Sequence, residues 1–130
     1  MTETEVTRHP QERRQGRAKM LRIFLGEADQ WQGEPLYEAI VKKLQTLQVA
    51  GATVYRGILG YGAKTGPDSE QSRRLSKDRP IMISTIDTAL RIAEAATAIE
   101  EMLEDGLIVV SDVDIIRIIH NHPEISNVDR

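Results

Sequence analysis

The chain has 130 residues, of which 40% are hydrophobic, 4% are aromatic and 28% are charged, with a formal net charge of -3. This length allows one domain with a usable core, and the negative balance disfavours broad attraction to nucleic acid or anionic membrane. The absence of cysteine excludes disulfides, thiolate metal sites and a cysteine nucleophile. Because no apolar run approaches the roughly 20 residues of a membrane span, and no signal-peptide segment is evident, we predict a cytoplasmic protein that binds no nucleic acid.

The chain begins with a polar stretch, residues 1–18, that ends in several basic side chains. Such a segment buries too little apolar surface to offset its ordering entropy, so we predict a disordered tail. The first strand is predicted at Met20–Gly26, with apolar side chains on both faces. The loop Gly26–Gly33 follows and holds the only tryptophan, Trp31, which we expect to cap the core or to lie in an interface.

A helix is predicted after this loop. Pro35 suits its first turn, because the missing N–H costs nothing there. Apolar residues then recur at helical spacing, at Leu36, Ile40, Leu44 and Leu47. The helix should end before Gly51, and a second strand should run from Ala52 to about Leu59.

The last third of the chain predicts a strand, a helix and a strand. The third strand should be Pro80–Ile86, and Asp87 is a natural N-cap for the second helix. The apolar stripe of that helix is Ile92, Ala96, Ile99 and Leu103. Gly106 should end the helix at the C′ position. The final strand is expected at 107–119, bent or interrupted near Ser111 and Asp112.

The order of elements is therefore strand, helix, strand, long loop, strand, helix, strand. It is typical of the ferredoxin-like βαββαβ fold, an α+β architecture with a four-stranded antiparallel sheet and both helices on one face. The domain should span residues 19–119, between the disordered residues 1–18 and a polar C-terminal tail at 120–130. The sheet face without helices needs cover, which we expect from oligomerisation.

The stretch Gly51–Gly62 carries the most informative pattern. It begins as a strand and then breaks into glycines at positions 57, 60 and 62. Glycine is useful where the backbone needs positive φ or where a ligand must approach it closely. The polar residues that follow have no apolar periodicity, so we predict a mobile binding arm at about 63–76. A long hairpin loop with permissive turns is the simpler alternative.

The arm and its base gather groups that suit an anionic ligand. Arginine offers bidentate contacts to phosphate or carboxylate, and N–H groups around the glycines can form an anion-binding nest. Acidic side chains in the loop after the first strand would accept from a ribose or an exocyclic amine. The predicted ligand-binding residues are Glu27, Asp29, Arg56, Gly57, Gly60, Tyr61, Gly62, Arg73 and Arg74.

Signals for catalysis or metal binding are sparse. Asp112 and Asp114 alternate on one strand face in the pattern of paired carboxylates, but a polar strand edge explains them as well. His120 and His122 are close enough in sequence to share a cation, yet further ligands are not evident. The sequence contains no nucleophile elbow, P-loop or dinucleotide fingerprint. We therefore predict no catalytic residues, no metal and no enzymatic activity.

Several motifs occur in a specific order: Gly26-Glu27, Gly33-Glu-Pro-Leu-Tyr-Glu-Ala-Ile-Val41, Ala50-Gly-Ala-Thr-Val-Tyr-Arg-Gly57, Gly60-Tyr-Gly62, Leu75-Ser-Lys-Asp78, Pro80, Gly106-Leu107 and the region of Val113. Over about residues 19–118 the chain resembles the PII-like family of unknown function from bacteria and archaea, whose genes often accompany fluoride-exporter genes. That family is related to the nitrogen-regulatory PII proteins and to the cation-tolerance trimers.

The resemblance implies a ferredoxin-like homotrimer with an effector arm after the second strand. It also implies that adenine nucleotides bind in clefts between subunits, at the base of that arm. By analogy the arm is residues 63–76 and its base is residues 56–62. Two features differ from the relatives. Residues 66–72 lack the histidine that the family often carries in the arm, and residues 106–110 replace the glycine-rich phosphate loop of PII proteins.

The leading hypothesis is a trimeric PII-like signalling protein that binds a small anionic effector, which we expect to be an adenine nucleotide. Its loop would engage a membrane transporter or another partner protein. One alternative is a small metal-binding or enzymatic trimer that uses Asp or His residues. Another is a purely structural interaction module.

Overall fold

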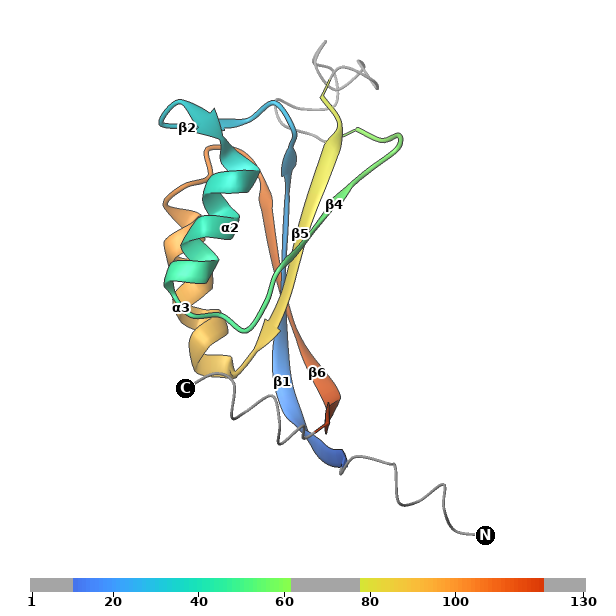
Figure 1. Ribbon diagram of the computed structural model, residues 1–130. Coiled ribbons are helices and arrows are strands. Elements are labelled where there is room, and N and C mark those ends of the chain that lie inside the picture. Colours follow the sequence, from blue (N-terminus) through green and yellow to red (C-terminus); the bar gives the residue numbers. More distant parts are fainter. Residues whose placement is uncertain (1–10, 62–77, 121–130) are drawn as a thin grey trace, which may run out of the picture. The chain divides into compact units, whose positions relative to one another are not determined.

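The computed structural model describes residues 11–61 and 78–120. The elements in chain order are β1 (Gln11–Gly26), β2 (Gln30–Trp31), β3 (Glu34–Pro35), α2 (Leu36–Thr46), β4 (Thr53–Arg56), β5 (Pro80–Asp87), α3 (Ala89–Glu100) and β6 (Leu107–His120). The four long strands form one sheet in the order β4-β5-β1-β6, and β2 pairs with β3 in a separate hairpin (Figure 1). The predicted α+β, ferredoxin-like fold is confirmed, with the small hairpin as an addition.

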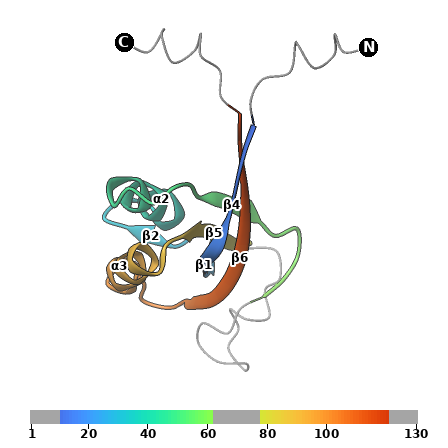
Figure 2. The ribbon, with the colours of Figure 1, turned by 90° about the horizontal axis from the view of Figure 1, so that it is seen from below.

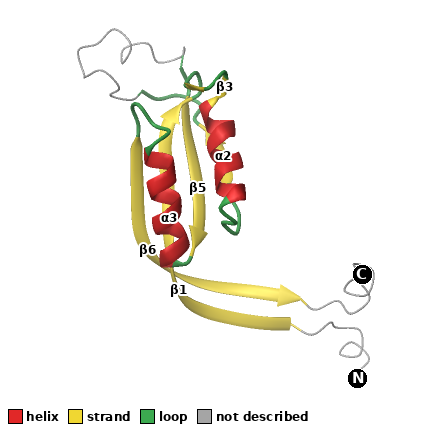
Figure 3. Ribbon diagram, turned by 90° about the vertical axis from the view of Figure 1, so that its left-hand side faces the viewer, coloured by secondary structure: helices red, strands yellow, loops and turns green. Residues whose placement is uncertain are grey.

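The chain divides into two compact units. One contains residues 18–113, and the other contains the described strand ends 11–17 and 114–120. In the larger unit both helices pack on the same face of the sheet (Figures 2 and 3). No helix among the described residues is long and apolar enough to cross a bilayer.

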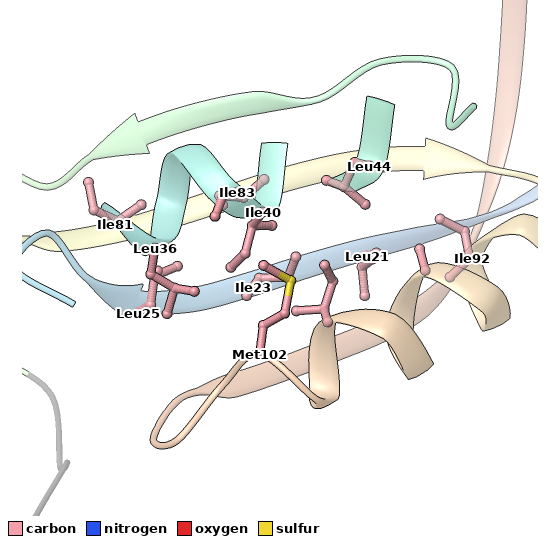
Figure 4. Packing of buried hydrophobic residues seen from close by; sticks show 13 residues of the cluster. Leu21, Ile23, Leu25, Leu36, Ile40, Leu44, Ile81, Ile83, Ile92 and Met102 are labelled. Carbon is pink, nitrogen blue, oxygen red and sulfur yellow. The ribbon is translucent and has the colours of Figure 1, made fainter. Parts of the chain in front are cut away.

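The core of the larger unit lies between the helices and the sheet (Figure 4). Alternation along the strands produces it, because side chains two residues apart share a face. Its members are Leu21, Ile23 and Leu25 from β1, Ile81 and Ile83 from β5, Leu36, Ala39, Ile40 and Leu44 from α2, Ile92, Ala95 and Ile99 from α3, and Met102 after it. Burying one such large side chain contributes about 1.5–3 kcal/mol. Trp31 packs against this cluster, as expected for a core cap.

The opposite face of the sheet carries exposed apolar side chains. Phe24 pairs across the strands with Met82, which pairs in turn with Tyr55. Phe24 is 37% exposed and Tyr55 is 52% exposed. On β6, Ile108 packs against the core, so Val109 beside it points to this open face and is also exposed. No helix of the described part of this unit covers the face.

The smaller unit corrects the predicted tails. β1 begins at Gln11, so residues 11–18 are strand rather than disordered tail, and β6 extends through His120. β6 is the sheet neighbour of β1 and provides backbone hydrogen-bonding groups. Backbone pairing does not require apolar side chains, which is why the polar composition misled the prediction. Within this unit Arg17 contacts Asp114 at 3.2 Å. Residues 1–10 and 121–130, with His122, lie outside the described residues.

Element boundaries differ from prediction around α3. The N-cap is Thr88, whose side chain accepts a hydrogen bond from the Arg91 N–H, whereas Asp87 accepts from the N–H groups of Ala50 and Thr88. α3 ends at Glu100, so Gly106 is not its C′ residue.

The two outer strands also differ in extent. β6 is continuous through Ser111 and Asp112, and an ion pair from Lys19 to Asp112 at 2.9 Å lies along it. β4 is limited to Thr53–Arg56 because its last backbone partner on β5 is Ile81, next to the first residue of that strand.

The loop after β1 contains a tight turn that the sequence did not reveal. β2 and β3 are separated by two residues, Gln32 and Gly33, whose φ angles are 47° and 86°. Positive φ at both positions is the pattern of a type I′ hairpin turn, whose twist matches that of the paired strands. The hairpin ends directly at α2 and so fixes Trp31 against the core.

Candidate ligand site at the ends of β1, β4 and β5

The ends of three strands lie together at one end of the sheet in the larger unit. Gly26, the last residue of β1, pairs with Pro80, the first residue of β5. Arg56, the last residue of β4, pairs with Ile81. The sheet thereby brings the loop after β1, the end of β4 and the chain just before β5 together, although they are far apart in sequence.

At the centre of these strand ends is an ion pair between Arg56 and Glu27. An Nη of Arg56 lies 2.6 Å from a carboxylate oxygen of Glu27. The two side chains are 51% and 32% exposed. The hydrogen bond and the attraction to Glu27 raise the pKa of Arg56, with a smaller contribution from Tyr37. Arg56, like any arginine, is a permanent cation, and its guanidinium has enough N–H donors to bind a second anion beside Glu27.

The backbone of the loop after β1 is held by three consecutive N–H donors. The Gly26 N–H donates to Asp29 Oδ2 at 3.0 Å. The Glu27 N–H donates to the Arg79 carbonyl at 2.9 Å. The Ala28 N–H donates to Asp78 Oδ1 at 2.8 Å. Asp29 was expected to contact a ligand. It also has a structural role, because one of its carboxylate oxygens accepts the Gly26 N–H and holds the loop.

The glycines at the end of β4 are explained by close packing. A Cβ on Gly57 would lie 2.5 Å from Cγ of Pro80, and one on Gly60 would lie 3.2 Å from the same atom. Neither glycine has positive φ, so that part of the prediction is wrong. The Gly57 N–H donates to the Pro80 carbonyl at 2.7 Å, so it is already engaged by the protein rather than forming a nest for an anion.

The remaining predicted site residues divide into two groups. Tyr61 is exposed and follows Gly60 directly. Gly62, Arg73 and Arg74 lie outside the described residues, as does the predicted arm at 63–76.

Sequence reasoning missed two residues of this site, Asp78 and Tyr37. Asp78 is the last residue of the motif Leu75-Ser-Lys-Asp78, but nothing in its local sequence distinguishes it from a solvated acid. Its role follows from the pairing of Gly26 with Pro80, which places the residues before β5 against the loop after β1. Tyr37 lies in the first turn of α2, where its helical position alone predicts a half-buried ring.

A hollow of about 570 Å³ adjoins the loop after β1. Its lining is Ala28, Asp29, Gln30, Trp31, Leu36 and the five residues 101–105. Four of these, Asp29, Glu101, Glu104 and Asp105, are acidic, and the lining includes no Lys or Arg among the described residues. Such a rim repels phosphate, so an anionic group is better placed at Arg56 than in this hollow.

The alternative carboxylate pair serves each unit separately. Asp112 contacts Lys19 in the larger unit, and Asp114 contacts Arg17 in the smaller unit. Both are exposed ion pairs of the kind that contributes about 0–1 kcal/mol. No group of three or more His, Asp or Glu side chains suited to a metal ion occurs among residues 11–61 and 78–120. These observations agree with a polar strand edge.

A protein-family model matches residues 18–115, and its family is described as an uncharacterized group, DUF190. The chain belongs to this family. It is 37% identical over 97 residues to the UPF0166 protein MJ1524 of Methanocaldococcus jannaschii, covering 74% of this chain and 89% of that protein. The matched residues include the whole of the larger unit, so the family's shared part contains the strand-end site.

Solved structures similar to this DUF190 protein include CPII of Thiomonas intermedia, a nitrogen regulatory PII-like protein. Its apo form matches with a TM-score of 0.60 and 18% identity, covering 82% of this chain and 99% of that chain. CPII bound to ADP, AMP and acetate matches with a TM-score of 0.58 and 19% identity, covering 78% and 91%. At this identity the likeness establishes the PII-like fold.

Proposed function

We propose that this DUF190 protein is a PII-like regulatory protein that binds an adenine nucleotide at the ends of β1, β4 and β5. The observation that carries the proposal is the exposed Arg56 guanidinium, held by Glu27 at 2.6 Å. Its place at the start of residues 56–62, the predicted base of the arm at 63–76, fits an effector site there. CPII, which shares the fold, has been solved bound to ADP and AMP, and this supports an adenine nucleotide as the ligand class.

Phosphate binding is proposed at Arg56 because its guanidinium is a cation whose side chain is 51% exposed. The guanidinium presents a planar fork that matches a phosphate group, and Glu27 orients it. The acidic lining of the hollow beside the loop disfavours phosphate there. Glu27 and Asp29 are the acceptors proposed for a ribose or an exocyclic amine. Gly60, Tyr61, Gly62, Arg73 and Arg74 are proposed to complete the site.

The assembly that we propose is a homotrimer with nucleotide sites in the clefts between subunits. Support comes from the uncovered face of the sheet, where Phe24, Tyr55 and Val109 expose apolar surface that a neighbouring subunit would bury. The residues at 63–76 are proposed to engage a membrane transporter or another partner protein in response to the nucleotide.

Calorimetric titration with ADP, AMP and ATP tests the site. Arg56→Lys keeps the positive charge but loses the fork, and we expect it to weaken nucleotide binding about tenfold or more, the scale of one charged hydrogen bond. Arg14→Lys is the matched control, because Arg14 is also exposed and pairs with a carboxylate, Glu12, at 3.1 Å. Affinity that is equal in the wild type and Arg56→Lys, at unchanged assembly, would place the phosphate elsewhere.

The metal-binding alternative predicts a different titration. Divalent cations without nucleotide would then give a saturable heat that Asp112→Asn or Asp114→Asn removes. We expect no such heat, because each of these carboxylates pairs with a cationic side chain of the protein.

A further inference from the structure

We infer that Asp78 is a positioning residue that holds the loop carrying Glu27 in the geometry that presents Arg56 to a ligand. The inference rests on the proposed function for the identity of the ligand, whereas its structural part concerns contacts within the described chain. Asp78 lies two residues before β5, and its carboxylate reaches the loop that follows β1.

The first step is the hydrogen bond from the Ala28 N–H to Asp78 Oδ1, at 2.8 Å. It joins residues that are 50 positions apart in sequence. The next residue, Arg79, accepts the Glu27 N–H through its carbonyl at 2.9 Å. Two consecutive residues before β5 therefore fix two consecutive peptide N–H groups of the loop, one on each side of the Glu27 Cα.

The second step is the absence of a side chain at Gly26. A Cβ built there would lie 2.3 Å from Asp78 Oδ2 and 2.7 Å from its Cγ. The carboxylate thus rests against the Cα of Gly26 in a space that only glycine leaves open. Since φ of Gly26 is not positive, its requirement for glycine comes from this contact rather than from backbone conformation.

The third step leads to the ligand. Gly26 and Ala28 flank Glu27, so a carboxylate that touches both determines where the Glu27 side chain starts. Glu27 in turn holds Arg56 at 2.6 Å. Losing Asp78 should release the loop, loosen the Glu27–Arg56 pair and weaken binding of an anion, although Asp78 itself need not touch the ligand.

The test compares Asp78→Ala, Asp78→Asn and Gly26→Ala. Asp78→Ala removes the acceptor of the Ala28 N–H, whereas Asp78→Asn retains an acceptor oxygen of the same reach. Gly26→Ala should displace the carboxylate, because the end of a side chain yields more readily than backbone. Gly51→Ala is the matched control, since a Cβ there meets nothing within 4 Å. ADP affinity by calorimetry, hydrogen exchange of the Ala28 amide and the thermal midpoint are measured on each full-length chain.

We expect Asp78→Ala and Gly26→Ala to weaken ADP binding about tenfold, the scale of one charged hydrogen bond, and to speed Ala28 exchange about as much. Asp78→Asn and Gly51→Ala should stay within about threefold of the wild type. The double variant Asp78→Ala with Gly26→Ala should bind ADP no more weakly than either single variant, because both changes remove the same contact. Wild-type affinity in Asp78→Ala, or unchanged Ala28 exchange, would overturn the inference. If the wild type fails to bind ADP, the proposed function fails, while the exchange rates still decide the role of Asp78.

Discussion

Two glycines at the strand-end site are needed because another part of the chain occupies the space of a side chain. At Gly26 that part is the Asp78 carboxylate, and at Gly57 it is the Pro80 ring. The sequence predicted that Gly57 matters, either for positive φ or for the close approach of a ligand, and it made no such prediction for Gly26. The true reason required the pairing of β1, β4 and β5, which brings residues from separate segments within contact and leaves no trace in local composition.

The Pro80 ring gives a prediction at Gly57. Gly57→Ala places a Cβ 2.5 Å from Cγ of Pro80 and 3.4 Å from its carbonyl oxygen. A proline ring yields less than a flexible side chain, so we expect a loss of about 1–3 kcal/mol in the free energy of unfolding, as for overpacking. Denaturant unfolding measures it, with Gly51→Ala as the control. Equal midpoints for the two variants would show that the ring moves aside at no cost.

Helices and strands follow from periodicity, but their ends follow from contacts. Apolar spacing predicted both helices, and residue types and alternation predicted the four long strands in their order along the chain. The polar residues at 11–18 looked disordered because their side chains bury little, yet strands are paired through backbone groups. At the start of α3, Asp87 and Thr88 are both good N-cap residues by type. Which of the two caps the helix depends on Ala50, whose N–H donates to the Asp87 carboxylate and so engages it elsewhere.

The cap of α3 predicts different effects for two substitutions of Thr88. Thr88→Ala removes the acceptor of the Arg91 N–H and should lower the free energy of unfolding by about 1 kcal/mol. Thr88→Ser keeps that acceptor, and serine caps at least as well as threonine, so it should not lower the free energy of unfolding. Circular dichroism during thermal unfolding distinguishes them, since about 1 kcal/mol corresponds to a shift of roughly 4–8 °C for a domain of this size. Coincident curves would mean that Thr88 does not cap the helix in solution.

In the larger unit, one face of the sheet is covered by the helices and the other is covered by no described helix. Apolar residues on both sides of β1 predicted this from the sequence, and exposed Phe24 and Tyr55 agree with it. The site, by contrast, was predicted only in part. Arg56 and Glu27 were named, but their pairing, the second role of Asp29 and the contribution of Asp78 depend on the topology of the sheet.

The uncovered face predicts how assembly should fail. Phe24→Glu introduces a charge whose burial in an interface is costly, so we expect light scattering to show smaller species than the trimer proposed for the wild type, at micromolar concentration. Because Phe24 does not belong to the core beneath the helices, the far-UV spectrum should be retained. Leu90→Glu is the control, as Leu90 is 69% exposed on α3. A monomeric wild type would remove the proposed sites between subunits.

The hairpin of β2 and β3 has a practical consequence for experiments. Its Trp31 is the only tryptophan in the chain. It lies two residues beyond Asp29 and lines the hollow beside the loop after β1. Indole emission depends on the polarity around the ring, so the unmodified protein contains its own fluorophore at the place where the loop would respond to a ligand. Stopped-flow mixing with nucleotide can therefore time any rearrangement of the loop without a chemical label.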